Sequence, residues 1–596
     1  MGFNVGFICA VFLLATQVMG VPAAAPWKKH FKGNFFKKKQ ALPIDTKFKL
    51  PAPPSTDSWP QVNVISNASK WLLIIASGEL LHAGGDFAKG IIDLGGLQVY
   101  EISTFSKVGG IYGGGSDDTG FSIFEPSVIP EGFSTLGSYS QVNSKPLYGW
   151  VLVAKDVSTN TSNPTLKQPV DYKLVWNSSS LTIDQDGPIY VWLPTAPYGY
   201  KAVGHVVTQT ADKPSLDKIR CVRSDLTDQC ETNSLIWELD NFNFYDVRPS
   251  NRGIHAPGVR VGTFVAQNGS SNPPSIACLK NTNAIPKYMP NLEQIKALLQ
   301  VYSPVMSLHP DEEYFPSSVE WFFNNGALLY KKGQESSPVT VQPDGSNLPQ
   351  DPNNDGAYWL DLPADGIDKE RVKKGDLPSA ISYVHVKPML GGTFTDIAMW
   401  VFYPFNGPGR AKVEFITINL GKIGEHVGDW EHVTLRVSNF NGELKHVYFS
   451  QHSKGTWLDS SQLEFQSGNK PLYYSSLHGH ASYPHAGLNL IGSDSIGIRN
   501  DTAKGDQVLD MGAFQLVSAQ YLGSDVVEPH WLNYFREWGP KIDYDINTEL
   551  KKLEKFLPGK LKTTLENIVK RLPSEMLGEE GPSGPKEKDN WSGDER

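Results

Sequence analysis

The chain has 596 residues, of which 40% are hydrophobic and 20% are charged, and its formal net charge is −9. This composition is that of a globular protein with about two to four domains, and it lacks the basic excess that nucleic-acid binders carry. The 55 Gly and 42 Pro residues, together with few long helix-periodic stretches, favour a β-rich fold with many turns.

The N-terminus carries an apolar run, VGFICAVFLLATQVMG, that ends near Gly20. The run is too short for a comfortable membrane span and is typical of a secretory signal, so we predict a signal peptide over residues 1–20. The protein would then be extracellular or vacuolar. An uncleaved anchor is the alternative, because Lys residues follow the run, and the body would then lie on the cytosolic face of an endomembrane. Residues 21–89 are predicted to be a basic, Pro-rich linker with a short helix.

Short alternating strands with Gly-rich turns begin near residue 97. Three segments, which start at Pro130, Pro197 and Ala256, share a turn with Pro and Gly followed by an aliphatic-Gly step. They predict three related sheets about a pseudo-threefold axis, an arrangement that resembles the β-prism modules of some sorting subunits and lectins. We assign residues 90–285 to this domain. Convergent hairpin chemistry is the alternative explanation of the three segments.

The chain contains four cysteines, and the first, Cys9, lies in the apolar leader. Cys221 and Cys230, in RCVRSDLTDQC, could close a small loop in an oxidising compartment, and we predict a disulfide between them. Cys278 would then be the unpaired cysteine.

A helix is predicted over residues 291–302, where apolar side chains recur on one face. A second β-rich domain is predicted over residues 300–540, and an amphipathic helical tail, interrupted at Pro558, over residues 541–575. The polar closing segment, residues 576–596, is predicted to be disordered.

The stretch GEHVGDWEHVTLRV, residues 424–437, contains the main candidate site. From Val433 onward aliphatic and polar residues alternate as in a strand, and the same parity places Asp429 and Glu431 on the aliphatic face. Unpaired buried charge is costly, so something must neutralise these two carboxylates.

A divalent ion is one solution, because His426 completes an H-x-x-D-x-E pattern whose oxygen-rich ligands favour magnesium or calcium. Pairing with Arg or a protonated His, or a general acid–base couple, are the alternatives. The sequence has no G-x-S-x-G elbow, no phosphate loop and no H-E-x-x-H motif, so we assign no catalytic residue. Further candidate ligand-binding residues lie nearby: Trp430, His452, His478 and His480.

Several strings of the chain together resemble one family: LGSYSQVNSKPLYGWVLVAKD, LHPDEEYFPSSVEWFF, DIAMWVFYPFNGPG, HVGDWEHVTLRV and NWSGDER. From about residue 90 onward the chain resembles the plant vacuolar protein sorting-associated protein 62 family, long catalogued as a domain of unknown function. The resemblance implies a role in vacuolar or endomembrane transport and attaches no enzymatic reaction.

A more distant resemblance rests on AMWVFYPFN (398–406), EHVGDWE (425–431) and SQH (450–452), in that order. The region from about 300 to 490 is similar to the necrosis-inducing protein family of secreted, lipid-binding cytolysins. That resemblance implies a β-sandwich over residues 300–540. The family carries Asp at the position of Asn406, which implies lower ion affinity here, and His-Arg where this chain has Val-Gly, which weakens the expectation of membrane-lytic activity. The implied metal ligands are Asn406, His426, Asp429 and Glu431.

The sequence thus predicts a mainly β protein, with a β-prism-like domain followed by a β-sandwich. We expect it to bind a membrane lipid or glycan headgroup without enzymatic activity, at a site organised by calcium or magnesium. The alternatives are a secreted cytolysin-like or defence protein, a trafficking adaptor with a purely structural site, and a hydrolase that uses Asp429 or Glu431. No nucleic-acid partner is expected, and the sequence does not identify a protein partner.

Overall fold

The computed structural model describes residues 44, 46–55, 58–60, 83–269, 273–283, 285–350, 356–452, 454–493, 496–555, 559–570 and 581–596. All of these residues belong to one compact unit, residues 42–596. This unit is mainly β, as predicted. The predicted signal peptide and much of the predicted linker lie outside the described residues. No helix in the described part is long and apolar enough to cross a membrane.

The N-terminal half, residues 91–280, consists of six small antiparallel sheets. Their strand orders are β1-β2-β7-β5, β3-β4-β6, β11-β13-β8, β12-β10-β9, β14-β19-β17 and β15-β16-β18. The strands are β1 (Ile91–Asp93), β2 (Leu97–Ile102), β3 (Phe105–Ile111), β4 (Phe121–Pro126), β5 (Ser134–Thr135), β6 (Tyr139–Val142), β7 (Val151–Asp156), β8 (Leu166–Lys167), β9 (Asp171–Asn177), β10 (Tyr190–Thr195), β11 (Tyr200–Lys201), β12 (Val206–Thr208), β13 (Cys221–Arg223), β14 (Thr227–Asp228), β15 (Cys230–Leu239), β16 (Phe242–Pro249), β17 (Gly258–Val259), β18 (Phe264–Asn268) and β19 (Cys278–Lys280).

The three aliphatic-Gly steps of the N-terminal half meet in its interior. Leu136, Val203 and Val261, one from each step, belong to the same buried cluster. Gly204 approaches the first step so closely that a Cβ atom would lie 2.6 Å from the carbonyl oxygen of Leu136, so a larger residue cannot stand there. The β-prism and its internal triplication stay predictions.

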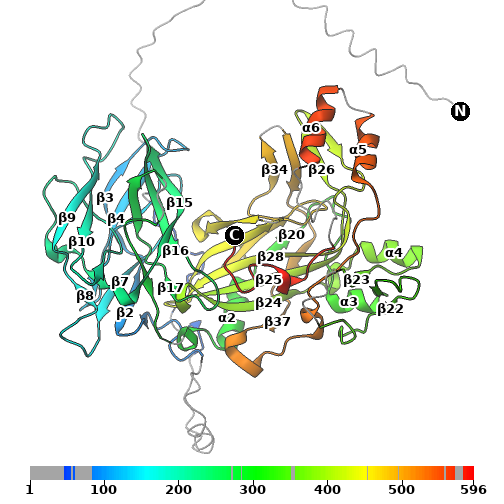
Figure 1. Ribbon diagram of the computed structural model, residues 1–596, viewed down its shortest axis with the longest axis horizontal. Coiled ribbons are helices and arrows are strands. Elements are labelled where there is room, and N and C mark those ends of the chain that lie inside the picture. The colour runs from blue at the N-terminus through cyan, green and yellow to red at the C-terminus, as the bar shows by residue number, and fades with distance from the viewer. Residues whose placement is uncertain are drawn as a thin grey trace, which may run out of the picture. The chain divides into compact units, whose positions relative to one another are not determined.

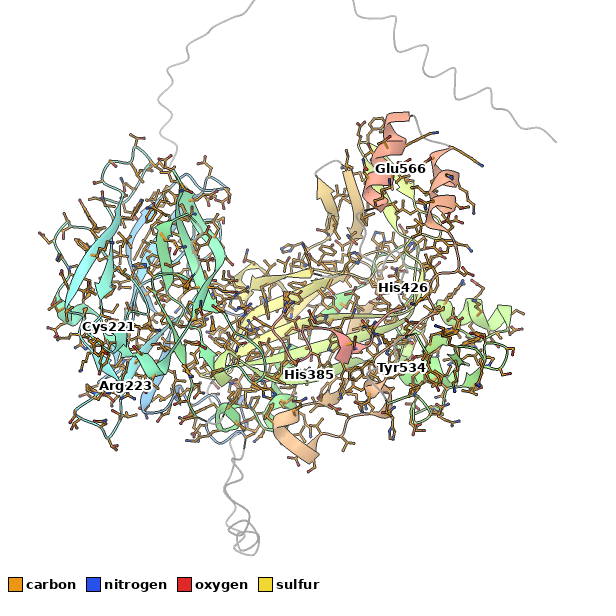
Figure 2. All side chains as sticks on the ribbon, in the orientation of Figure 1. Cys221, Arg223, His385, His426, Tyr534 and Glu566 are labelled. Atoms are coloured by element: carbon orange, nitrogen blue, oxygen red, sulfur yellow. A yellow bond between two sulfur atoms is a disulfide. The ribbon has the colours of Figure 1, made fainter. Side chains whose placement is uncertain are left out.

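The disulfide prediction is wrong. Cys230 is bonded to Cys278, which lies 48 residues further along the chain, and Cys221 is a buried free cysteine in the N-terminal half (Figure 2). Cys230 begins β15 and Cys278 begins β19, and both side chains lie in one small hydrophobic cluster. The partner was therefore set by the packing of these strands and not by the short spacing between Cys221 and Cys230.

The C-terminal half is built around a six-stranded sheet of order β30-β29-β28-β25-β24-β37 (Figure 1). Smaller sheets have the orders β31-β32-β20-β36, with β33 on β32, β22-β21-β23 and β27-β26-β35-β34. The β-sandwich assigned to this region stays a prediction. The strands are β20 (Val305–Ser307), β21 (Leu328–Lys331), β22 (Val339–Thr340), β23 (Tyr358–Asp361), β24 (Ser382–Met389), β25 (Phe394–Asn406), β26 (Arg410–Val413), β27 (Ile416–Asn419), β28 (His426–Ser438), β29 (Leu444–Gln451), β30 (Lys454–Asp459), β31 (Glu464–Gln466), β32 (Lys470–Ser475), β33 (Ser482–Tyr483), β34 (Gly487–Ser493), β35 (Ile496–Thr502), β36 (Val508–Asp510) and β37 (Phe514–Ser518).

Helices pack against these sheets, α2 (Leu292–Tyr302) against the aliphatic residues of the six-stranded sheet. A helix begins where it was predicted, after Asn291, whose side chain forms a capping box with Gln294. Two helices occupy the predicted amphipathic tail, and Leu550 and Leu565 pack them onto the sheet of β26 and β35. The α-helices are α2 (Leu292–Tyr302), α3 (Val319–Asn324), α4 (Gly366–Lys373), α5 (Ile546–Glu554) and α6 (Gly559–Val569), and the 3-10 helices are η3 (Leu216–Lys218), η4 (Ser224–Leu226), η5 (Ile285–Tyr288), η6 (Leu377–Ser379), η7 (Leu390–Gly392), η8 (Ser460–Gln462), η9 (Gln520–Asp525), η10 (His530–Asn533) and η11 (Pro585–Glu587).

The six-stranded sheet has one aliphatic face and one polar face. Across β25, Asp429 pairs with Tyr403 and Glu431 with Val401, and both partners belong to the same hydrophobic cluster as Val433. The prediction that the two carboxylates share the aliphatic face is therefore confirmed. The opposite face is polar and aromatic, as the pairing of its strands shows: His385 and Lys387 of β24, Asp396 and Trp400 of β25, His432, Thr434 and Arg436 of β28, His446 and Tyr448 of β29, and Trp457 and Asp459 of β30.

The closing segment of the chain lies on this polar face, beside β28 (Figure 1). The predicted disorder of residues 576–596 is therefore wrong for 581–596, the part that is described. Trp591 is 6% exposed and stacks on His385, with 3.9 Å between ring centroids. Asp594 pairs with Arg436, and Glu595 is only 2% exposed. Buried partners thus order a segment whose composition alone indicates disorder.

Candidate functional site

A cavity of about 530 Å³ lies at the end of β28 where Asp429 and Glu431 are found. We call it the β28 cavity. The four predicted metal ligands all line it: Asn406 ends β25, and the other three belong to β28. Of the other predicted ligand-binding residues, Trp430 and His452 line it, whereas His478 and His480 lie just behind its wall, on either side of Gly479. In Figure 2, His426 marks the start of β28 on this side.

Asp429 is hydrogen-bonded to a histidine. The Nδ1 atom of His480 lies 2.9 Å from Oδ2 of Asp429, and the imidazole is buried and stacks on Tyr403 at 3.8 Å between ring centroids. Burial acts to raise the pKa of Asp429, but the hydrogen bond from His480 and the charges of His426 and His480 outweigh it, so the pKa lies below its usual value. Of the alternatives left open by the sequence, a histidine partner is the one found for this carboxylate.

Glu431 accepts a hydrogen bond from the hydroxyl of Ser450 on the neighbouring strand β29. The same hydroxyl accepts the backbone N–H of His432 at 3.2 Å, so the donor of Glu431 is itself held in place. Burial and, after it, the charge of Glu431 raise the pKa of Tyr473 behind this carboxylate. Glu431 is 9% exposed, and its carboxylate thus lies at the boundary between the core and the β28 cavity.

Hydrogen bonds orient His426 and Asn406 toward ligand binding. Nδ1 of His426 lies 3.1 Å from the carbonyl oxygen of Gly428, which can only accept, so Nδ1 carries a proton. The amide nitrogen of Asn406 donates to the carbonyls of Gly407 (3.0 Å) and Gly424 (2.7 Å), which leaves its carbonyl oxygen as an acceptor. In many cation sites a histidine donates one ring N–H to a backbone carbonyl, and carbonyl oxygens are held in fixed positions.

Three histidines around the cavity have strained backbones. His452, His478 and His480 have φ values of 59°, 66° and 55°, in the left-handed region that residues with a side chain rarely adopt. His452 Nε2 lies 3.1 Å from Oδ1 of Asn500, which also lines the cavity. The buried Nδ1 of His478 and Nδ2 of Asn500 have no hydrogen-bond partner among the described residues. Strain and unpaired polar atoms concentrated in one place are typical of binding sites.

The closing segment forms the wall that sequence reasoning missed. Asn590, Glu595 and Arg596 line the β28 cavity together with other residues of 581–596. Glu595 lies 3.1 Å from Nε2 of His432 and accepts from Asn590 at 2.9 Å. The signal that could have revealed this wall was Trp591, the one large apolar residue among the polar residues 581–596.

The chemistry of the donors only partly fits a metal ion. In the described part of the chain, no three His, Cys, Asp or Glu side chains are grouped closely enough to hold one. One oxygen of Asp429 is bonded to His480 and one of Glu431 to Ser450, so both carboxylates already have protein partners. The predicted cation therefore stays a prediction.

The sequence model of the family described as vacuolar protein sorting-associated protein 62 matches residues 75–595. Two proteins of the yeast Saccharomyces cerevisiae are similar to part of the chain. TDA6 is 27% identical over 224 residues, which cover 31% of this chain and 46% of TDA6. Vacuolar protein sorting-associated protein 62 is 25% identical over 220 residues, which cover 31% of this chain and 44% of the yeast protein. The chain thus spans less than half the length of these curated relatives.

Solved structures with some likeness include GNIP1Aa from Chromobacterium piscinae, with 22% identity, a TM-score of 0.27 and coverage of 35% of this chain and 40% of that one. Another is Necrosis and Ethylene inducing Protein 2 from the causal agent of cocoa's Witches Broom disease, with 12% identity, a TM-score of 0.19 and coverage of 38% and 76%. A third is NLPPya in complex with glucosamine, with 12% identity, a TM-score of 0.20 and coverage of 44% and 90%. These TM-scores are too low to support a conclusion about ligand or activity.

Proposed function

The chain belongs to the vacuolar protein sorting-associated protein 62 family, and on that premise we propose that it acts in vacuolar protein sorting as a peripheral, non-enzymatic binder of a sugar-bearing headgroup. The site of binding is the β28 cavity. Its ligand class is a hydroxyl-rich glycan, free or attached to a lipid.

The mixture of hydrogen-bonding groups in the β28 cavity supports this ligand class. Asp429 and Glu431 offer acceptor oxygens, whereas Arg499 and Lys454 offer donors in the same cavity. A strongly anionic ligand would meet the two carboxylates and a strongly cationic one the basic side chains, and both would be opposed. Sugar hydroxyls donate and accept at once, so a glycan can satisfy both kinds of group. Trp430 supplies an aromatic element to the lining, as ligand pockets commonly have.

A calcium or magnesium ion is a further part of the proposal. The residues that would hold it are His426, Asn406, Asp429 and Glu431. Such an ion would add positive charge beside the carboxylates and give sugar hydroxyls a site at which to coordinate. Asp429 also has a protein partner, His480, in the absence of an ion.

The test measures binding of the full chain to two forms of one sugar. Flotation with phosphatidylcholine vesicles that contain glucosylceramide reports a lipid-attached headgroup, and calorimetric titration with methyl glucoside reports a free one. We expect Asp429→Asn with Glu431→Gln to weaken binding about tenfold or more, because each change removes a charged acceptor. Glu464→Gln is the matched control, since this carboxylate is 45% exposed, pairs with His485 and lies outside the cavity.

Binding of neither form by the wild-type protein would refute the proposal, and so would equal binding by the double variant with an unchanged circular dichroism spectrum. Binding of methyl glucoside without glucosylceramide vesicles would assign a free glycan. Addition of EDTA separates the ion from the sugar: a loss of binding that calcium or magnesium restores supports the ion, and unchanged binding removes the ion from the proposal.

A further inference from the structure

A second cavity, of about 490 Å³, lies between the N-terminal half and the polar face of the six-stranded sheet. Strands β6, β15 and β16 contribute to one side, and β28, β29 and β30 to the other. We call it the Arg260 cavity, after the residue that reaches into it from the segment between β17 and β18. It is separate from the β28 cavity: their linings have no residue in common.

Three buried nitrogen atoms of the lining have no hydrogen-bond partner among the described residues. They are Nε of Arg260, Nε1 of Trp457 and Nδ1 of His446. The first two are N–H groups that can only donate. A buried donor without a partner costs roughly 1–3 kcal/mol, so three around one cavity indicate a place built for acceptor atoms.

His446 fits the same interpretation as a neutral group. Burial, followed by the charges of Arg260 and Arg436, holds the pKa of His446 well below its usual value. The ring is therefore uncharged at physiological pH, and its Nδ1 can donate in one tautomer. The imidazole and the indole of Trp457 lie on the same polar face, on neighbouring strands, with 6.3 Å between ring centroids.

The donors are held in fixed positions by their other contacts. Nη2 of Arg260 donates to Asp246 at 2.6 Å, which leaves the Nε side of the guanidinium for the cavity. The indole of Trp457 lies under the guanidinium of Arg436 at 4.1 Å, and Arg436 in turn makes a bidentate pair with Asp396. Because these side chains are already ordered, the free energy of ligand binding is not reduced by the entropic cost of ordering them.

The lining is also richer in cations than in carboxylates. Three carboxylates line the cavity, Asp246, Asp459 and Asp594. Acids such as Asp396 and Glu101, which pair with cations of the lining, are not part of it. An anion in the cavity therefore faces more positive than negative groups at short range, while the acids behind keep the cations in place. The lining cations are Lys145, Arg248, Arg252, Arg260, Arg436 and Lys445.

We propose that the Arg260 cavity binds a small oxyanion, a carboxylate or a phosphate ester, through Arg260, Trp457 and His446. Arg260 belongs to the N-terminal half and the other two to the six-stranded sheet, so the ligand joins the two halves of the chain. This inference is independent of the function proposed for the β28 cavity.

The test is calorimetric titration of the full chain with inorganic phosphate and with acetate, and with acetamide as the neutral counterpart of acetate. Acetate and acetamide lack the sugar hydroxyls that the β28 cavity is proposed to bind. We expect at least one of the two anions to bind and acetamide to bind much more weakly. The anion that binds more tightly assigns the phosphate or the carboxylate class. Loss of a hydrogen bond to a charged partner is expected to weaken binding roughly tenfold or more.

Two variants each remove one donor and leave the packing close to wild type. Arg260→Lys keeps the charge beside Asp246 but loses the Nε–H group, and Trp457→Phe keeps a ring under Arg436 but loses the indole N–H. Arg223→Lys is the matched control, since Arg223 pairs with Asp225 and lies outside the cavity (Figure 2). A weaker anion affinity in both variants, with the control unchanged, supports the proposal.

Three results would overturn it: neither anion binds the wild-type chain, acetamide binds as tightly as acetate, or both donor variants bind the anion like wild type. Glu431→Gln, which acts on the β28 cavity, is expected to leave anion binding unchanged. If the β28 cavity fails to bind a glycan, the test of anion binding in the Arg260 cavity is therefore unaffected.

Discussion

The variant Glu595→Gln tests whether the closing segment is held by buried charge. Burial acts to raise the pKa of Glu595, but the charges of His432 and Lys387 and the hydrogen bonds from His432 and Thr434 lower it from 4.5 to about 2. A difference of one pKa unit corresponds to about 1.4 kcal/mol, so this charge stabilises the folded state by about 3 kcal/mol. Glutamine has the same shape but no charge, and its amide nitrogen adds a donor where Thr434 and Asn590 already donate.

The sign of the pH dependence follows from the depressed pKa. The stabilisation is complete above the unfolded pKa of Glu595 and is lost as the pH falls toward the folded value of about 2. The difference in free energy of unfolding between wild type and Glu595→Gln should therefore be about 3 kcal/mol at pH 7 and about 2 kcal/mol at pH 3.5.

Urea denaturation followed by circular dichroism measures the global effect, and native-state hydrogen exchange of residues 581–596 detects local release of the segment. Asp589→Asn is the control within the same segment, because Asp589 and its partner Arg596 are each 78% exposed and such pairs contribute about 1 kcal/mol or less. A loss below about 1 kcal/mol for Glu595→Gln in both assays, or a loss that does not shrink at low pH, would refute the reasoning.

Two further predictions concern the backbone and the disulfide. Gly428→Ala should destabilise the protein by about 2 kcal/mol or more. Gly428 has a φ of 67°, and a Cβ atom there would lie 2.3 Å from the carbonyl oxygen of Trp538. A melting temperature equal to that of the wild type would contradict this prediction. Non-reducing peptide mass spectrometry should recover a peptide with Cys230 linked to Cys278, and Cys221 as a thiol. A peptide with Cys221 linked to Cys230 would show that this pairing is wrong. In urea denaturation, Cys278→Ala should lower the free energy of unfolding by about 2–4 kcal/mol, because the bond closes a long loop.

Local pattern was sufficient to place the main elements of the site. Period-two alternation from Val433 onward put Asp429 and Glu431 on the aliphatic face, and the observed pairing of Asp429 with Tyr403 agrees. The helix after Asn291 was equally readable, because an N-cap residue and an apolar face are local signals. Such features depend on residues that lie only a few positions apart in the sequence.

The errors share one physical cause, which is pairing between residues far apart in the chain. The partner of Cys230 depends on how β15 and β19 pack, and the order of the closing segment depends on Arg436 and His432, which lie more than a hundred residues earlier. Likewise, nothing in the spacing of the histidines showed that His480 would pair with Asp429. Composition correctly described the tail as polar, but it carried no information about the complementary charges on the sheet.

Asp594 and Glu595 are consecutive residues of the closing segment, yet Asp594 lines the Arg260 cavity and Glu595 lines the β28 cavity. The two cavities thus share one short stretch of backbone as a common wall. If a ligand in one cavity shifted this stretch, it would change the affinity of the other, and linkage would require the effect to be equal in free energy in both directions. Titration of each cavity with and without the ligand of its neighbour measures this coupling.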